Sequence, residues 1–394
     1  MRVVVVFWIL LLIVFRLQLS FLGFLDFKYK PSQTLDVKVV NQYKKKNYFV
    51  LKIKNETLTF YTTSKENLKN LLNENISLTI LTKNVGFWGY LTTFYAFSYN
   101  MKLKPISFLE EKIEKQHQSI KISNLFKALF LGSSIDFDTR KQLAALGVSH
   151  LFALSGLHLG FISFILFMII SPVYRFFHKK FPYRNKLVDI GIVVLIMEFL
   201  YLKFTSFPPS LIRAYVLEMV MFFFFFTLRD ILNIKILIYT FFIAFFVFFT
   251  KIFSIGFLLS MVGVYYIYLF FNYYKANLYT SFLLSFYMFL VMFIWGHCFF
   301  GYMNNYQLLS PIVNILFSVF YPLEVVLHFL GLGGIFDGII LKYLSFGEKY
   351  YYVNISLWFL IFFILLSFIA IKKKWAFYGI NLLAFIILIS SVKI

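Results

Sequence analysis

The sequence predicts a polytopic α-helical membrane protein with an N-terminal extracytoplasmic OB-like β-barrel domain. Three observations predict this fold class. Of the 394 residues, 61% are hydrophobic and only 14% are charged, whereas soluble domains carry about 25% charged residues. Apolar runs of about 20 residues, the length that crosses a bilayer as a helix, recur through the C-terminal part of the chain. Residues 26–120 instead contain short stretches that alternate between polar and apolar residues, as half-buried strands do.

The first apolar run covers residues 3–25, with Arg2 before it and Arg16 inside it. No small-residue cleavage site is obvious after the run. We therefore interpret residues 1–25 as an uncleaved transmembrane anchor and not as a signal peptide that is removed.

Residues 26–120 are expected to form the OB-like domain. They carry fifteen lysines against eight acidic residues. Between the third and fourth alternating stretches, residues 64–72 read as a short helix with Ser64 as its N-cap. Five strands with a helix in that position match an OB-type barrel, a fold that commonly binds oligonucleotides; another small β domain is the alternative. The predicted strands are residues 35–43, 48–53, 57–62, 76–83 and 90–99.

Residues 121–149 are predicted to form two amphipathic helical pieces, separated by residues 132–138. Apolar residues recur at helical spacing in the first piece and resume after the polar break. We expect both pieces to lie along the membrane surface or beneath the barrel.

Residues 150–394 are predicted to form a multi-span domain. The loop after residue 171 is basic and contains no acidic residue, which indicates the cytoplasmic side. Residue 150 then faces outward, Arg2 lies inside, and the basic region 26–149 lies outside, because long segments translocate regardless of charge. The predicted spans are 150–171, 187–204, 210–228, 235–250, 252–271, 278–300, 307–330, 352–371 and 375–392.

Strict alternation of these spans fails near the C-terminus, because it places Lys372, Lys373 and Lys374 outside. If one of the predicted spans is re-entrant and does not cross the membrane, the three lysines return to the cytoplasmic side. The best candidate is 307–330, since Pro322 interrupts this run and removes a backbone donor. We expect this segment to line a cavity.

The stretch 147–160 is the most informative of the chain, since it places two histidines, two serines and three glycines at the start of a span. Unpaired polar groups at membrane depth cost about 1–2 kcal/mol or more each, so they usually face a protein interior or a water-filled path. Helix packing and a hydrophilic pathway are the leading interpretations, a metal site is a weaker one, and a serine hydrolase dyad is the least favoured. On a continuous helix His150 and His158 stand about 12 Å apart, too far to share a metal ion.

Within this stretch Ser155 and His158 share a helix face because they are three residues apart. Gly156 and Gly160 permit a close helix approach. No Gly-x-Ser-x-Gly elbow surrounds Ser155, which disfavours the hydrolase interpretation.

The stretch resembles the "HLLAISGLHV" motif of the ComEC/Rec2 competence family. Residues 124–132 resemble the family's segment before that motif, and three later segments match in the family's order. Pro209, Ser210 and Arg213 belong to a "PSxxRA" motif, Ser260 to a "GFxLS" motif, and Asn314 to an apolar helix with one asparagine. The resemblance covers about residues 120–330 and departs from the family where Thr250, Lys251 and Ile252 replace the usual proline.

The resemblance implies a channel that admits single-stranded DNA through the bacterial inner membrane during natural transformation. It implies partners in an uptake machinery: a DNA receptor, a nuclease and a motor protein. The expected lining comes from the spans that hold His150, Ser155, Gly156, His158, Pro209, Ser210, Arg213, Ser260 and Asn314. Many relatives carry a metallo-β-lactamase-like domain, but these 394 residues contain no His-x-His-x-Asp-His cluster and no Walker loop. We expect a protein that is not an enzyme and uses no cofactor and no metal.

The charge pattern independently favours a polyanionic partner. The formal net charge is +21, which suits anionic lipid of the bilayer, nucleic acid, or both. In the OB-like domain a basic and aromatic cluster could hold single strands by stacking and charge; a solvated hairpin turn is the alternative. The cluster consists of Tyr43, Lys44, Lys45, Lys46 and Tyr48.

Arg213 is the second basic candidate, because an arginine inside a span is a functional hypothesis by default. It could bind a phosphate or pair with Glu198 or Glu218. Two rival functions stay open: a secondary transporter for a small anionic solute, and an intramembrane serine hydrolase that uses Ser155 with His297.

Overall fold

The computed structural model describes residues 2–45, 48–55, 58–64, 71–103, 107–181, 183–226 and 234–392. The chain divides into two compact units. We call the first the sheet unit; it comprises residues up to Glu111 together with Phe242–Ser254. We call the second the helical unit; it comprises Lys112–Phe241 and Ile255–Ile394.

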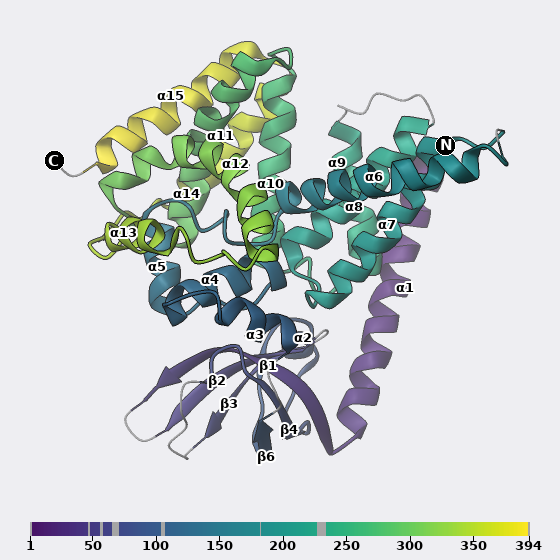
Figure 1. Ribbon diagram of the computed structural model, residues 1–394, viewed down its shortest axis with the longest axis vertical. Helices are drawn as coiled ribbons and strands as arrows, with labels where there is room; N and C mark the ends of the chain where they lie inside the picture. The colour runs from purple at the N-terminus through teal and green to yellow at the C-terminus, as the bar shows by residue number, and fades with distance from the viewer. Residues whose placement is uncertain are drawn as a thin grey trace. The chain divides into compact units, whose positions relative to one another are not determined.

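The sheet unit begins with the long helix α1 (Arg2–Tyr29) and continues into a six-stranded, mostly antiparallel sheet (Figure 1). Arg16, which interrupts the apolar run of α1, lies 5.7 Å from the centre of the Phe249 ring. The strand order is β5-β3-β2-β1-β4-β6. The strands are β1 (Ser32–Lys44), β2 (Phe49–Lys54), β3 (Thr59–Ser64), β4 (Asn75–Leu81), β5 (Phe94–Tyr95) and β6 (Ser98–Leu103).

The alternation seen in the sequence produces the core of the sheet unit. Every second residue of a strand points to the same face, and on β2 and β4 those residues are apolar. Each fully buried aliphatic or aromatic side chain contributes about 1.5–3 kcal/mol. The fully buried set includes Val39, Leu51, Ile53, Phe60, Ile76, Leu78 and Ile80.

Four of the five predicted strands are confirmed, and the fifth is partly wrong. Residues 90–99 were expected to be one strand, but Phe87–Leu91 is the short helix α2 and the strand signal resumes as β5 and β6. The Phe87 and Tyr90 rings of α2, with Phe94 of β5, pack on Phe24 and Phe27 of α1, so tertiary packing overrides the local strand preference. The predicted helix 64–72 falls largely on residues 65–70, outside the described part.

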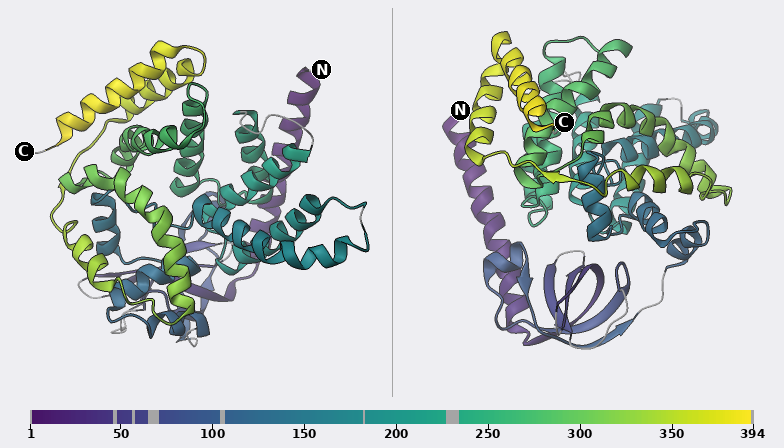
Figure 2. Two further views of the ribbon diagram at one scale, coloured as in Figure 1. Left: turned by 45° about the horizontal axis from the view of Figure 1, so that its top comes forward. Right: turned by 90° about the vertical axis from the view of Figure 1, so that its left-hand side faces the viewer.

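One segment, residues 94–103, reaches both ends of the strand order. β5 pairs parallel with β3, and β6 pairs antiparallel with β4. Between them the backbone N–H of Ala96 donates to Tyr61 (2.9 Å), and the Phe97 carbonyl accepts from Leu81 (3.0 Å). The curvature that this requires is visible in Figure 2.

The helical unit consists mainly of apolar helices, and each predicted span overlaps one of them. Within the described part of the chain, four helices are long and apolar enough to cross a membrane, and α9, α10 and α14 are shorter apolar helices. The protein is therefore a multi-pass membrane protein. The span predicted to begin at residue 150 begins at Gly156 instead. The longer helices are α6 (Gly156–His178), α7 (Lys186–Phe204), α8 (Pro209–Phe226), α9 (Ile234–Val247), α10 (Ile255–Phe271), α11 (Leu278–Phe299), α12 (Ser310–Phe329), α14 (Leu357–Ala370) and α15 (Lys374–Ser391).

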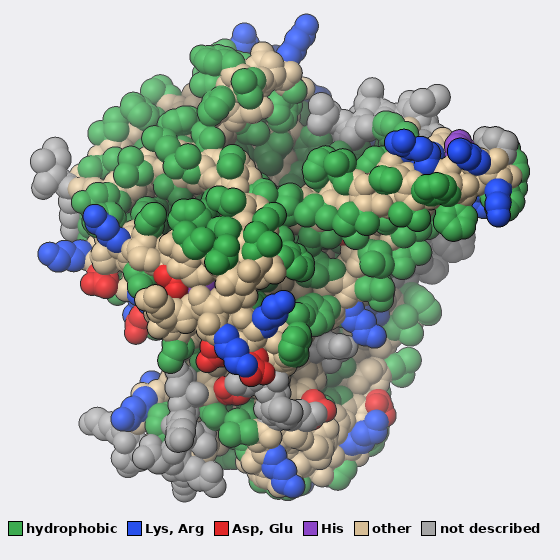
Figure 3. All heavy atoms as spheres, viewed as in Figure 1, with side chains coloured by type: hydrophobic (Ala, Val, Ile, Leu, Met, Phe, Trp, Pro, Cys, Tyr) green, Lys and Arg blue, Asp and Glu red, His purple; other side chains and the backbone are tan. Residues whose placement is uncertain are grey.

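The surface of the helical unit fits this assignment. In Figure 3 apolar side chains cover the face over α6, α8 and α12, while lysine and arginine side chains gather at the far end of α6. α14 and α15 lie side by side as a hairpin (Figure 2), joined by the three lysines at 372–374.

Two shorter helices, α4 (Ile120–Leu131) and α5 (Phe137–Ala145), coincide with the two predicted helical pieces, whose amphipathic role stays a prediction. Gly132, at φ +70°, ends α4 in the left-handed conformation that favours glycine. The buried face of α4 packs into one apolar core with Phe317 and Tyr321 of α12. Their position relative to the membrane surface stays a prediction.

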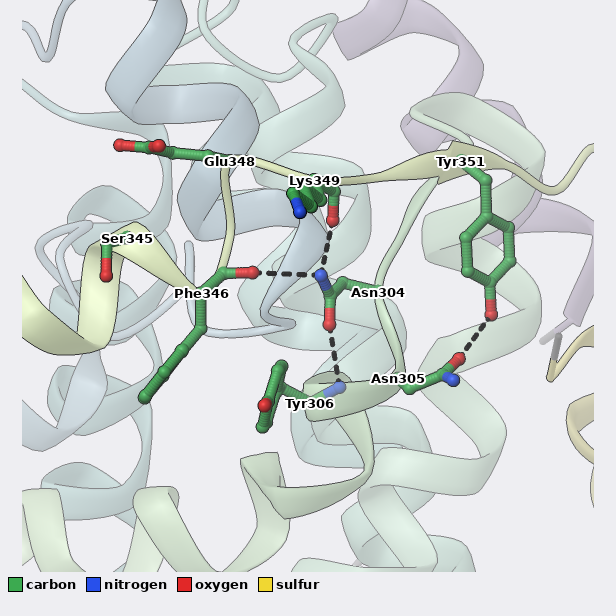
Figure 4. A pocket seen from close by; sticks show the side chains of 8 residues that line it. All are labelled: Asn304, Asn305, Tyr306, Ser345, Phe346, Glu348, Lys349 and Tyr351. Atoms are coloured by element: carbon green, nitrogen blue, oxygen red, sulfur yellow. Dashed lines mark hydrogen bonds between the residues drawn. The ribbon is translucent and has the colours of Figure 1, made fainter. Parts of the chain in front are cut away.

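The chain turns back on itself between α11 and α14. The strand β7 (Tyr302–Met303) pairs with β8 (Tyr351–Tyr352), and the short helices η1 (Asn305–Leu309) and α13 (Asp337–Ser345) lie between them in the sequence. Asn304 fastens this turn: its amide donates to the carbonyls of Phe346 (2.9 Å) and Lys349 (Figure 4). The two ends of the segment 302–352 are therefore neighbours.

Candidate functional site

The start of α6 is organised around Ser155 and His158. Ser155 is the N-cap residue and His158 the third residue of the helix. The Ser155 backbone N–H donates to His158 Nδ1 (3.0 Å), and the Ser155 hydroxyl lies 2.9 Å from the same nitrogen. This reciprocal arrangement is a capping box in which a histidine stands where glutamate is usual.

Capping also fixes the state of the His158 ring. Because Nδ1 accepts from the backbone, the ring proton belongs to Nε2. Nε2 is buried and has no hydrogen-bond partner in the described part of the chain. The ring stands edge-on to Tyr321 of α12, with ring centres 4.4 Å apart.

The first turn of α8 packs directly on this cap. Pro209 opens α8, where its fixed φ suits the first turn. The Ser210 hydroxyl donates to the Leu154 carbonyl (2.5 Å). A β-carbon built on Gly156 would lie 3.6 Å from Ala214 and 3.7 Å from the Arg213 guanidinium, so Gly156 is the point of close approach. Gly160, the other candidate, faces open space.

Arg213 reaches from α8 to α10. Its Nε donates to the Ser260 hydroxyl over 2.7 Å. Among the described residues no ion pair joins Arg213 to Glu198 or Glu218, so the predicted alternative of such a pair is wrong. The two carboxylates instead meet each other, since both contact the Ser163 hydroxyl, Glu218 at 2.7 Å.

The α12 side of the site holds the remaining predicted residues. The His150 side chain lies near Asn314, and Phe152 lies 5.9 Å from Phe317 between ring centres. Residues 150–155 are not helical, so the assumption of one helix through His150 and His158 is wrong. The break lets His150 contact α12 while His158 caps α6.

Within the helical unit the predicted residues therefore fall into two groups. His150 lies near Asn314, and the α6 cap at Ser155, Gly156 and His158 packs on the start of α8, where Arg213 reaches Ser260. The connection before α6, the start of α8, α10 and α12 each supply a part. We call this set the motif cluster: His150, Ser155, Gly156, His158, Pro209, Ser210, Arg213, Ser260 and Asn314. It combines one cation with several hydroxyl and amide groups. Among the described residues no group of three or more His, Cys, Asp or Glu could hold a metal ion.

The DNA-binding candidates of the sheet unit lie at the β1–β2 hairpin. Lys44, Lys45 and Tyr48 are exposed there, and the Lys45 N–H donates to the Tyr48 carbonyl (2.9 Å) across the turn. The Tyr43 hydroxyl accepts from the Asn41 amide (3.0 Å). Lys46 lies outside the described residues.

The sequence interpretation missed two groupings in the helical unit. One is the pair Glu198–Glu218 around Ser163. The sequence shows each glutamate as a charge in an apolar run, but it does not show that the two side chains lie together. The other is His117 with His328, more than two hundred residues apart in the chain. Neither grouping belongs to a contiguous motif, so only the packing of the helices reveals it.

Comparison with known proteins bears on the same region. A family model described as Competence protein matches residues 129–393. No curated protein and no solved structure matches the chain. The matched range contains the whole motif cluster and covers more than half of the sequence. The chain therefore belongs to the competence protein family, the ComEC/Rec2 family of its motifs, and has a role in DNA uptake during competence.

Proposed function

We propose that this protein is a channel that passes single-stranded DNA across the plasma membrane during natural transformation. The observation that supports the proposal is the motif cluster. Four segments distant in sequence bring hydroxyl, amide, imidazole and guanidinium groups together inside an apolar bundle. A path for a phosphate chain needs such a lining, because bare hydrocarbon would leave the phosphates unsolvated.

Arg213 is the central element of this proposal. Its only described hydrogen bond is to the neutral Ser260 hydroxyl, and among the described residues no carboxylate forms an ion pair with it. A guanidinium has five donors, so most remain for a ligand. Arginine forks match phosphate geometry in two parallel hydrogen bonds. We propose that Arg213 contacts the backbone of the passing strand.

The turn at β7 and β8 supports a topology in which residues 26–149 lie outside the cytoplasm. Since residues 302 and 352 are paired, the segment between them crosses the membrane an even number of times. α13 has nine residues, about 14 Å of helix, which is too short to cross. We infer that α12 does not complete a crossing either. This arrangement returns the lysines at 372–374 to the cytoplasmic side, as the loop-charge rule requires.

The sheet unit is proposed to be an OB-type barrel that receives the DNA. In support, β1, β2 and β3 form a meander, β4 returns beside β1, and residues 94–103 pair with both β3 and β4. An OB barrel has this connectivity. The exposed β1–β2 hairpin supplies two lysines and a tyrosine, which suit phosphate and base contacts.

We propose that the protein acts without catalysis, with a nuclease, a motor and a DNA receptor as separate partners. The contact of Ser155 with His158 has the distance of a nucleophile and its base. The same histidine nitrogen also accepts a backbone N–H, which accounts for the contact as a helix cap. Uptake energy and strand degradation then come from outside this polypeptide.

The test combines binding and transport. Purified full-length protein in lipid nanodiscs should bind fluorescent single-stranded DNA with steep salt dependence, and a strain without the protein should leave labelled DNA outside the inner membrane. Restoring the wild-type protein should restore entry. A transporter of small anions would show neither result, and a hydrolase would tolerate loss of the basic hairpin but not loss of the Ser155 hydroxyl. Entry at the normal rate without the protein would refute the channel.

A further inference from the structure

A second polar grouping of the helical unit lies apart from the motif cluster. It is a row of four side chains, Asp337, His117, His328 and Glu324, which we call the histidine row. His117 lies between α3 (Phe108–Glu114) and α4, His328 and Glu324 lie in the last turns of α12, and Asp337 opens α13. The side chains of His117 and Glu324 are fully buried, and those of Asp337 and His328 are 8% and 9% exposed.

Three contacts link the row. His117 Nδ1 lies 2.8 Å from Asp337 Oδ1. His117 Nε2 lies 3.1 Å from His328 Nε2. His328 Nδ1 lies 2.8 Å from the Glu324 carbonyl and 3.2 Å from Glu324 Oε2.

Each contact needs one proton, because two lone pairs at such distances repel. The Glu324 carbonyl can only accept, so His328 Nδ1 carries a proton. Ionised Asp337 can also only accept, and its second oxygen already accepts the Gln118 N–H (3.2 Å). Two neutral imidazoles supply two protons for three contacts. The middle contact of the two Nε2 atoms therefore requires a third.

We propose that the histidine row is a proton-binding site: it holds one proton more than two neutral imidazoles carry, and loss of that proton at higher pH opens the contact between residues 116–118 and helices α12 and α13. The argument does not depend on which member carries the charge. If Asp337 is protonated instead, the row still contains three protons.

The surroundings stabilise a positive charge in the row. Phe126 of α4 stacks on the His117 ring at 4.6 Å and 6°, and Phe130 meets the His328 ring edge-on at 4.8 Å. An aromatic ring attracts a cation placed against its π face. The charged groups that contact the two imidazoles are Asp337 from α13 and Glu324 from α12. Tyr321 of α12 contacts the Phe130 ring, and the Lys127–Glu114 ion pair joins α4 to α3. Burial lowers the pKa of His117, and the adjacent Asp337 opposes that effect.

The site also has a mechanical consequence. Gln116 accepts the Gly333 N–H (3.0 Å) and donates to the His328 carbonyl (3.3 Å). Together with the row these bonds fasten the α3–α4 connection to the turn between α12 and α13. In the proposed topology, on which this step rests, that connection is extracytoplasmic, so external pH would set the state of the row.

A metal ion is the competing occupant. Two nitrogens on a tetrahedral zinc ion, with bonds of about 2.0–2.1 Å, stand only slightly farther apart than the two Nε2 atoms. Structural zinc takes four ligands, however, and the described residues contain no group of three suitable side chains. With only two histidine nitrogens in position, the histidine row therefore fits a shared proton better than a zinc ion.

The experiment uses full-length protein labelled with ¹⁵N-histidine in lipid bilayers, between about pH 6 and pH 9, a range that brackets the ordinary histidine pKa. We expect the ring nitrogens of two of the six histidines to share an extra proton at the low end and lose it as the pH rises. His117→Gln should remove both altered signals, and His178→Gln, at the end of α6, should leave them unchanged. Two singly protonated neutral rings throughout, with Asp337 ionised over the same pH range, would overturn the proposal, as would stoichiometric zinc binding that His117→Gln abolishes.

A second variant covers the case in which His117→Gln fails to fold. In His328→Gln the amide N–H can donate to His117 without an extra proton. The wild-type melting temperature should fall as the pH rises through the release of the proton, whereas that of His328→Gln should stay flat across the same range. The sign follows because only the folded row holds the additional proton there. A parallel fall in both proteins would contradict the site independently of any DNA uptake assay.

Discussion

The sheet unit and the helical unit use polar residues in opposite ways. In the sheet unit the core is mainly apolar and the candidate ligands for DNA, Lys44, Lys45 and Tyr48, are exposed at a turn. In the helical unit Arg213, His158 and Glu198 are set among apolar helices and hold those helices to one another. The candidate DNA-binding residues of the sheet unit can therefore be replaced without disturbing its core. In the helical unit the residues of the candidate DNA path also hold the helices together, so replacing them disturbs the packing as well.

The same contrast separates the expected consequences of substitution. Exposed charges act through screened, nearly additive interactions. Buried polar groups act through a few strong contacts whose loss leaves a partner unsatisfied. Substitutions in the helical unit should therefore give steep effects, and those in the hairpin graded ones.

Replacing Arg213 with Ala should have the largest effect. We expect DNA entry to fall at least about a hundredfold, since hydrogen bonds to charged groups are worth about 1.5–3 kcal/mol each. Arg213→Lys should retain part of the DNA entry, because lysine keeps the positive charge but lacks the paired donors of the guanidinium group. Entry of labelled DNA, normalised to the amount of protein in the membrane, measures this effect.

Arg175→Ala is the matched control, since Arg175 is exposed in the last turn of α6. It should leave entry near the wild-type rate. Wild-type entry in Arg213→Ala at normal protein levels would place the path elsewhere and remove the distinction between the two units.

Membrane sidedness provides the second test, and its result is all-or-none. In a Cys298→Ser background, which lacks cysteine, a cysteine at Leu330 should react with an impermeant reagent from outside. A cysteine at Lys373 should react only after the membrane is opened. The proposed topology, which rests in part on the paired ends of residues 302–352, predicts this outcome. Reaction at 373 from outside would restore strict alternation and disprove the proposed return of α12.

Local patterns predicted the elements of both units well. Apolar runs predicted each long helix of the helical unit, and alternation predicted four strands, because burial is periodic along a strand or helix. The errors lie where tertiary contacts decide. Tyr90 belongs to a helix because it packs on α1, and residues 150–155 leave the helix because Ser155 caps α6.

The motif cluster was predictable only as separate pieces. Resemblance indicated which residues matter, but neither spacing nor composition relates Arg213 to Ser260, forty-seven residues later. The sequence suggested two carboxylates as possible partners of Arg213, but in the structure its partner is a hydroxyl. Partner choice between helices depends on helix rotation and crossing, which a single sequence does not encode locally.

The Ser155 cap should give an intermediate effect. Ser155→Ala should destabilise the start of α6 by about 0.5–2 kcal/mol, the usual cost of losing an N-cap side chain. Ser155→Asn should restore most of this stability, because asparagine caps helices as well as serine does. Melting temperature and DNA entry should change together across the three proteins.

The asparagine variant also separates the channel from the hydrolase alternative. Asparagine cannot act as the nucleophile that a serine dyad needs. If Ser155→Asn is fully stable yet takes up no DNA, the hydroxyl has a chemical role and the cap is not its main purpose.

The smallest effect is expected at the hairpin of the sheet unit. Replacing Lys44 and Lys45 with Ala removes two exposed charges, and each phosphate contact with a single strand contributes about 0.7 to the slope of log affinity against log salt. The slope measured with the purified protein should therefore fall by about 1.4 when both contact phosphate. Lys30→Ala is the control, because Lys30 already pairs with Asp26 at 2.9 Å and should change the slope little. An unchanged slope in the double variant, with Arg213→Ala still defective in uptake, would show that the helical unit alone engages DNA, and the hairpin would then be only a solvated turn.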